Sequence, residues 1–166
     1  MHFATVEEIT MSSFNNPYNI TIPDQSTTII YSPYRDGVDG AHGWQALYSA
    51  SNESAYDVNS TENKAAGLSS HSTTFAGASF QIDFMGSAIT LFGTAAPDIY
   101  TTALDGGNAN SGAPADGVLA QYTSLDLKPH TLVLNVTGNQ GLQFTAANIT
   151  IGVGYPGYVL LLLSMV

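Results

Sequence analysis

Residues 78–84 alternate strictly between apolar and polar side chains. Phe80, Ile82 and Phe84 would share one face of an extended chain. The other face would carry polar side chains, namely Ser79, Gln81 and Asp83. This period of two is typical of an antiparallel strand with one buried face, and no segment shows a competing helical period. The pattern therefore favours an all-β chain.

Other short segments rich in Thr, Val, Ile and aromatic residues lie between Gly, Pro, Asn and Asp, as expected for strands joined by turns. The strands we expect are residues 18–22, 27–31, 78–84, 88–93, 99–104, 118–124, 130–136, 143–145 and 148–153. Gly86-Ser87 and Asp105-Gly106-Gly107 predict hairpin turns. The fold class is an antiparallel β-sandwich of about nine strands, with a further short strand expected near residues 44–48 within the long polar stretch 32–74.

The chain has 166 residues, 44% of them hydrophobic and 10% charged, which indicates one folded domain with a sizeable core. We divide it into an N-terminal extension (1–17), the sandwich (18–153) and an apolar tail (154–166). The net charge of -10 leaves no basic surface for nucleic acid. The absence of Cys excludes thiolate metal sites and Cys nucleophiles.

Five Asn-x-Ser/Thr acceptor sites for N-linked glycans occur, whereas about two would arise by chance at this composition. They are Asn19, Asn52, Asn59, Asn135 and Asn148. Strand alternation points three of them (Asn19, Asn135 and Asn148) outward. The same alternation predicts that the neighbouring apolar side chains point inward. These are Tyr18, Ile20, Ile22, Leu132, Leu134, Val136, Ile149, Ile151 and Val153. We therefore expect a secreted, glycosylated protein of the extracellular space or cell surface.

The polar stretch supplies side chains of the kinds that bind carbohydrate, an aromatic ring with charged and polar groups nearby. The candidate glycan-binding residues are Tyr34, Arg35, Asp36, Asp39, His42 and Trp44. Trp44 is the central candidate, and burial in the core is its alternative. We expect no cofactor, although the acidic turn Asp36-Gly-Val-Asp39-Gly40 leaves calcium binding open beside plain turn formation.

The tail after Gly154 is apolar without alternation. A helix of nine residues would be about 14 Å long, less than half of the roughly 30 Å hydrocarbon core, so the tail cannot span a bilayer. It is interpreted as a packed strand within or between chains, a truncated membrane anchor, or a lipid-anchor signal. The candidate self-association residues are Tyr158, Val159, Leu160, Leu161, Leu162 and Leu163.

Several motifs carry a resemblance to a known family. They are Asp24 with Thr28-Ile-Ile-Tyr-Ser32, Gly43-Trp44, His71-Ser-Thr-Thr74, residues 77–94, Tyr100 with Leu104-Asp105-Gly106, and His130-Thr-Leu-Val-Leu134. Residues 22–153 resemble extracellular β-sandwich modules of basidiomycete fungal surface proteins, which are similar in fold to galactose-binding-like jelly rolls. The resemblance implies a jelly-roll sandwich and no defined ligand.

We found no catalytic motif. The sequence lacks G-x-S-x-G, H-E-x-x-H, a phosphate-binding loop and a dinucleotide fingerprint, and His130 fits a turn role at a strand entry. We therefore expect no enzyme, but a non-catalytic structural protein that self-assembles as a homo-oligomer or polymer, with fibres as one form. The alternative is a lectin-like module that recognises cell-wall or host glycans.

Overall fold

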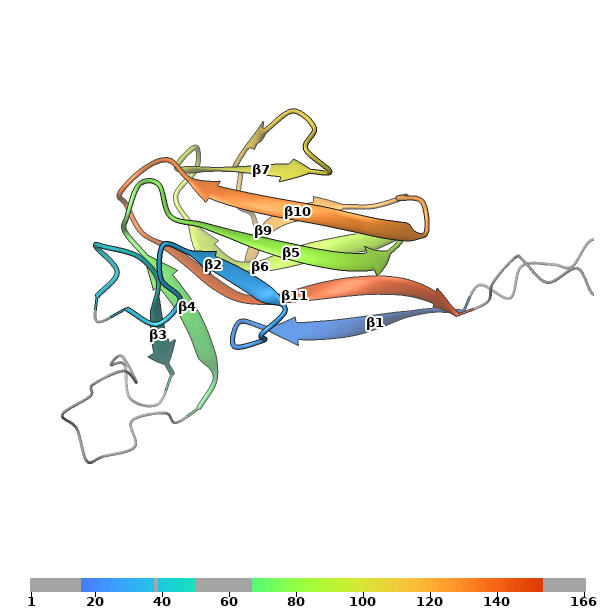
Figure 1. The fold of residues 1–166 in the computed structure, drawn as a ribbon, viewed down its shortest axis with the longest axis horizontal. Helices are drawn as coiled ribbons and strands as arrows, with labels where there is room; N and C mark the ends of the chain where they lie inside the picture. Colours follow the sequence, from blue (N-terminus) through green and yellow to red (C-terminus); the bar gives the residue numbers. More distant parts are fainter. Residues whose placement is uncertain (1–15, 38, 50–66, 154–166) are drawn as a thin grey trace, which may run out of the picture.

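The computed structural model describes residues 16–37, 39–49 and 67–153, and all regular structure in these ranges is β-strand (Figure 1). The strands are β1 (Asn16–Pro23), β2 (Ile29–Ser32), β3 (Gln45–Tyr48), β4 (Ser69–Thr73), β5 (Ser79–Gly86), β6 (Ala88–Ala95), β7 (Tyr100–Leu104), β8 (Asn110–Ser111), β9 (Val118–Tyr122), β10 (Lys128–Val136) and β11 (Leu142–Val153). The predicted all-β class is confirmed.

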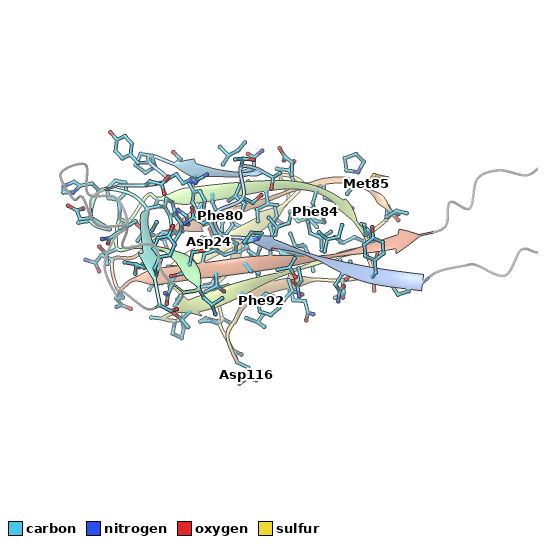
Figure 2. All side chains as sticks on the ribbon, turned by 90° about the horizontal axis from the view of Figure 1, so that it is seen from below. Asp24, Phe80, Phe84, Met85, Phe92 and Asp116 are labelled. Atoms are coloured by element: carbon cyan, nitrogen blue, oxygen red, sulfur yellow. The ribbon has the colours of Figure 1, made fainter. Side chains whose placement is uncertain are left out.

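Two antiparallel sheets face each other as a sandwich. One has the order β3-β4-β11-β6-β9, with β1 paired to β11, and the other has the order β2-β5-β10-β7-β8. The alternating side chains of β5 and β10 meet the inner residues of β6 and β11 between the sheets (Figure 2). Phe80 and Phe144, from opposite sheets, have ring centroids 4.6 Å apart. The predicted inward residues Leu132, Leu134 and Val136 are buried.

The predicted hairpin at Gly86-Ser87 is wrong, because β5 and β6 belong to different sheets. A Cβ on Gly86 would lie 2.7 Å from both Ile149 Cγ2 and the Thr150 carbonyl oxygen. The glycine therefore lets β5 approach β11 closely, and the chain turns there from one sheet to the other. The second turn was predicted correctly, since β7 pairs with β8 across Asp105-Gly106-Gly107.

The predicted strands 143–145 and 148–153 are a single strand, β11. A register shift between Phe144 and Ala146 marks a β-bulge, which inserts one residue and changes the side-chain phase. Phe144, Ala147 and Ile149 are all buried as a result.

Strand β4 was not predicted, because its sequence is entirely Ser, His and Thr. Ser70, His71 and Thr73 are nevertheless buried. A polar strand becomes stable in this position only because hydrogen-bond partners surround it. The short strand β8 was also missed.

Among the described strands, β1 lies at the edge of its sheet and pairs with β11 alone. Tyr18 and Ile20 stand opposite Ile151 and Ile149 in the register, yet they are 47% and 41% exposed. The predicted burial of these two side chains is wrong. Pairing with β11 determines on which face of the sheet they lie, but the opposite sheet does not cover them there. Ile22 and Ile151 pack partly buried against the core.

The predicted outward asparagines are found as expected in the described strands. Asn19 and Asn135 are exposed and Asn148 is half-buried. Asn52, Asn59, the proposed self-association residues of the tail and the side chain of Val153 lie outside what the structure describes. Within the described ranges, no helix is long and apolar enough to cross a membrane.

Candidate functional site

A buried polar network joins the loop after β1 to strand β4. Asp24 is 1% exposed, and its Oδ2 lies 2.8 Å from Nδ1 of the fully buried His71. The other carboxylate oxygen accepts a hydrogen bond from Ser69 Oγ at 2.5 Å. One carboxylate therefore holds two side chains of β4 (Asp24 is labelled in Figure 2).

The network continues through His71 into the loop between β2 and β3. Nε2 of His71 lies 3.3 Å from Asp36 Oδ1. Arg35 Nε donates to Asp36 Oδ2 at 3.0 Å, and Arg35 Nη2 donates to Gln25 Oε1 at 3.2 Å. A chain of hydrogen-bonded side chains thus runs from the buried Asp24 carboxylate to the half-buried Arg35.

Tyr31 covers this network from the core side. Its ring stacks on the imidazole of His71 with centroids 4.4 Å apart, and its hydroxyl donates to the Asp24 carbonyl oxygen at 2.9 Å. Burial raises the pKa of Tyr31 far above its ordinary value, and the charge of Asp24 raises it further. Tyr31 therefore acts as a neutral hydrogen-bond donor.

The residue types in this network are those of a Ser-His-Asp hydrolase, but their arrangement differs. In a catalytic triad the serine bonds one imidazole nitrogen and the aspartate bonds the other. Here Ser69 bonds Asp24 instead, and the second nitrogen of His71 faces Asp36. The network has no activated nucleophile and joins the two loops to β4.

Trp44 does not offer a ring to a ligand. Its side chain is fully buried, and its indole Nε1 donates to the carbonyl oxygens of Ser32 and Ser79 at 3.2 and 3.0 Å. The prediction of Trp44 as a binding platform is wrong, because the loop after β2 folds back and places the ring in the core. Tyr34, by contrast, is 63% exposed.

The other predicted glycan-binding residues do not form one surface. Arg35 and Asp36 belong to the buried network, whereas Asp39 and His42 form a separate exposed pair with 2.9 Å between Oδ1 and Nδ1. The hydrogen bond from His42, followed by that from the Ala41 amide, lowers the pKa of Asp39.

The acidic turn 36–40, for which calcium binding was left open, is also divided between the Arg35–Asp36 pair and the Asp39–His42 pair. Asp36 and Asp39 contact different partners, so their carboxylates do not converge. Among the residues that the structure describes, no group of three or more His, Asp or Glu side chains is placed to hold a metal ion.

An open hollow of about 710 Å³ lies on the outer face of the five-stranded sheet, over β5 and β10. It is a shallow, open depression of the surface and not an enclosed cavity. It is lined by Gln81, Asp83, Phe84, Met85, Asp105, Pro129, His130 and Thr131. Met85 is 45% exposed and, in Figure 2, lies on the outer side of β5.

A row of polar side chains crosses the hollow from β5 to β10. Asp83 stands opposite Thr131, whose Oγ1 donates to Asp83 Oδ1 at 2.7 Å. Gln81 Nε2 donates to both carboxylate oxygens of Asp83, at 3.0 and 3.1 Å. The next pair on the same face of the sheet, Met85 opposite Pro129, is apolar. The hollow therefore places hydrogen-bonding groups directly beside apolar surface.

A histidine–aspartate pair supports one side of the hollow. His130 Nδ1 lies 2.8 Å from Asp105 Oδ2, and its Nε2 lies 2.8 Å from the Asp126 carbonyl oxygen. Because both ring nitrogens face acceptors, the charged imidazolium is favoured. The hydrogen bond to Asp105, then that to Asp126, raises the pKa of His130. The hydrogen bonds from His130 and the Thr131 amide lower the pKa of Asp105.

Known structures share this fold. A family two carbohydrate esterase from Cellvibrio japonicus superposes with a TM-score of 0.52 over 85% of this chain, at 10% sequence identity. A two-domain esterase active on acetylated mannans, crystallised with mannopentaose, superposes with a TM-score of 0.50 over 82% of this chain, at 14% identity. At these identities the likeness establishes the fold. No protein-family model and no curated protein sequence matches the chain.

The chain spans little more than a third of these esterases, 36% and 37% of their lengths. The comparison corrects two expectations, since both of these structures are carbohydrate esterases. They overturn the prediction of a non-catalytic, self-assembling structural protein and the prediction that the chain is not an enzyme. The resemblance to fungal surface modules stays a prediction.

The residues of the hollow were not selected as a site from the sequence. Gln81 and Asp83 were predicted to lie on the polar face of a strand, and His130 to serve as a turn residue at a strand entry. The missing information is which strands are neighbours, because the pairing of β5 with β10 brings Asp83 to Thr131. Outward polar residues on a predicted strand were the only available signal.

Proposed function

We propose that this chain functions in the enzymatic deacylation of polysaccharide, and that its sandwich holds the polysaccharide in the hollow over β5 and β10. The ester-cleaving step is not assigned to the described residues, because neither buried histidine there has a serine hydroxyl at a free ring nitrogen. The role assigned to the sandwich is to bind and orient the polymer.

The observation that carries this proposal is the row of Gln81, Asp83 and Thr131 beside Met85 and Pro129. Sugar hydroxyl groups donate and accept hydrogen bonds, and carboxylate, amide and hydroxyl side chains match them. The C–H faces of a sugar ring are apolar and pack on surfaces such as those of Met85 and Pro129. An open hollow also suits a polymer, because it leaves room for the chain to continue on both sides.

The structural neighbours support the same substrate class, since one of them is active on acetylated mannans. A protein that acts on such a polymer works where the polymer is, outside the producing cell. This agrees with the extracellular location predicted from the N-glycan acceptor sites.

Retention on acetylated mannan tests the proposal, measured by affinity electrophoresis of the full chain in gels with and without the polymer. We expect the wild-type protein to be retarded. Asp83→Ala should weaken retention roughly tenfold or more, because it removes a charged hydrogen-bonding group. Acetate released from the polymer, measured on the same preparation, tests the enzymatic part, and the same substitution should lower it.

The matched control is Gln121→Ala, an exposed polar position on β9 of the other sheet. This variant should bind as the wild type does. Equal retention of wild type and Asp83→Ala would show that the hollow does not hold the polymer. Absence of retention for the wild type would contradict the proposed function as a whole.

A further inference from the structure

Two of the N-glycan acceptor sites, 127 or more residues apart in the sequence, meet on neighbouring strands. The register of β1 with β11 places Asn19 opposite Thr150 and Thr21 opposite Asn148. Each asparagine therefore faces the threonine of the other acceptor site. The four side chains lie on the outer face of the first sheet, on the opposite side of the sandwich from the hollow.

The four side chains are joined by two reciprocal hydrogen bonds. Thr150 Oγ1 donates to Asn19 Oδ1 at 2.8 Å, and Thr21 Oγ1 donates to Asn148 Oδ1 at 2.7 Å. Both bonds use the amide oxygen of the asparagine. Neither amide nitrogen has a hydrogen-bond partner among the described residues. The nitrogen atoms that would carry glycans are thus the atoms left unengaged.

We propose that Asn19 and Asn148 carry a pair of N-linked glycans, held side by side by these hydrogen bonds. The donor is a lipid-linked oligosaccharide of the secretory pathway. The Nδ2–C1 bond forms as the bond between C1 and the pyrophosphate oxygen breaks. Nδ2 loses one proton, and the lipid pyrophosphate leaves. Because Oδ1 takes no part in the new bond, both threonine hydrogen bonds persist in the glycosylated protein.

The sequence separation allows both sites to be modified. Asn19 and Thr150 are 131 residues apart, so each acceptor site meets the transferase separately while the chain is still unpaired. Folding then brings the two asparagines to diagonal positions on the ribbon, roughly 7–8 Å apart. The threonine hydroxyls, which an acceptor site must present, are engaged only after this step.

A glycan pair here would protect an exposed sheet edge. Of the strands that the structure describes, only β11 pairs with β1, and an open edge is prone to pairing with other chains. Bulky polar groups beside it would hinder such pairing. They would also leave the hollow on the other sheet accessible, so this inference is independent of the proposed function.

Intact-mass and peptide mapping of the full chain, secreted from a eukaryotic host, test the pair. We expect Asn19→Gln and Asn148→Gln each to lose one glycan and the double variant to lose two. Thr21→Ser should keep both glycans. Thr21→Val should lose only the glycan on Asn19, because the acceptor site of Asn148 is intact. In an Asn19→Gln background, where neither variant carries the glycan of Asn19, amide hydrogen exchange in β1 and β11 should be faster in Thr21→Val than in Thr21→Ser, since only valine lacks the hydroxyl that bonds Asn148.

Three results would overturn the proposal. The first is a secreted chain without a glycan at either asparagine, and the second is a population in which the two glycans never occur on the same molecule. The third is equal amide exchange in Thr21→Val and Thr21→Ser in the Asn19→Gln background, which would show that the Thr21 hydroxyl does not hold the glycosylated Asn148 to β1. Asn135→Gln serves as the control. Asn135 lies on the other sheet, so this substitution should leave the glycans of Asn19 and Asn148 in place.

Discussion

The molecule contains two histidine–aspartate pairs with the same 2.8 Å contact and very different surroundings. His71 and Asp24 are 0% and 1% exposed, and the second nitrogen of His71 faces another carboxylate. His130 is nearly as buried, at 3%, but Asp105 is 41% exposed beside the open hollow. The first pair lies inside a closed network, whereas the second lies next to groups that a ligand can reach.

The difference shows how burial changes the role of identical chemistry. A carboxylate without water must receive all its hydrogen bonds from the protein, so removing Asp24 would leave buried donors without partners. A carboxylate in contact with water loses much less when its partner is removed. We therefore assign the Asp24–His71 pair to stability and the Asp105–His130 pair to the shape and charge of the hollow.

Substitution of Asp24 should have the largest effect. Asp24→Ala leaves His71 and Ser69 without their acceptor, and breaking a buried pair in this way typically costs about 3–5 kcal/mol. The free energy of unfolding in urea measures this loss. Asp126→Ala is the control, because the Asp126 side chain is 86% exposed and should not change stability measurably. A loss for Asp24→Ala no greater than for this control would remove the distinction between the pairs.

The Asp105–His130 pair should produce a smaller, pH-dependent effect. Because the pKa of His130 is raised above 6.5 in the folded chain, its stabilisation is complete below pH 6.5 and is lost as pH rises through the raised value. Because the pKa of Asp105 lies below 3.8, its stabilisation is present above pH 3.8 and is lost as pH falls through the lowered value. The pair therefore stabilises most between these limits.

The free energy of unfolding, measured from pH 6 to pH 9, tests the predicted direction of this pH dependence. The wild type should lose stability across the range, and Asp105→Asn should lose less, since His130 no longer has a charged partner. The titration of the His130 ring, followed by NMR, should move to lower pH in Asp105→Asn. An unchanged titration would show that Asp105 does not raise the pKa of His130.

The exposed Asp39–His42 pair should have the smallest effect. Both side chains are well exposed, at 49% and 80%, so water replaces the lost contact. Asp39→Asn should leave the urea midpoint unchanged within error. A clear loss of stability would mean that the loop between β2 and β3 depends on this surface contact as well as on Asp36.

The strands of the core were predictable where side chains alternate in polarity. Phe80, Ile82 and Leu134 are buried as their spacing indicates, because the period of a strand is local information. The two sheets to which β5 and β6 belong were not predictable. That assignment depends on Gly86 lying against β11, a contact between distant parts of the chain.

The candidate sites were less predictable than the fold. His71 belongs to a strand without apolar residues, and its burial depends on Asp24 and Asp36 from two separate loops. Trp44 was predicted either as a surface platform or as a core residue, because residue type alone does not fix burial, and the structure buries it. The hollow was missed since it forms only when β5 and β10 pair.

Titration of the isotopically labelled chain with mannopentaose, followed by amide chemical shifts, tests the central claim that the hollow holds the polysaccharide. The predicted result is saturable shifts at Gln81, Asp83, Met85 and Thr131, with little change at Asp24 and His71. Shifts confined to the loop that carries Arg35 and His42, or no saturable shifts, would contradict the account.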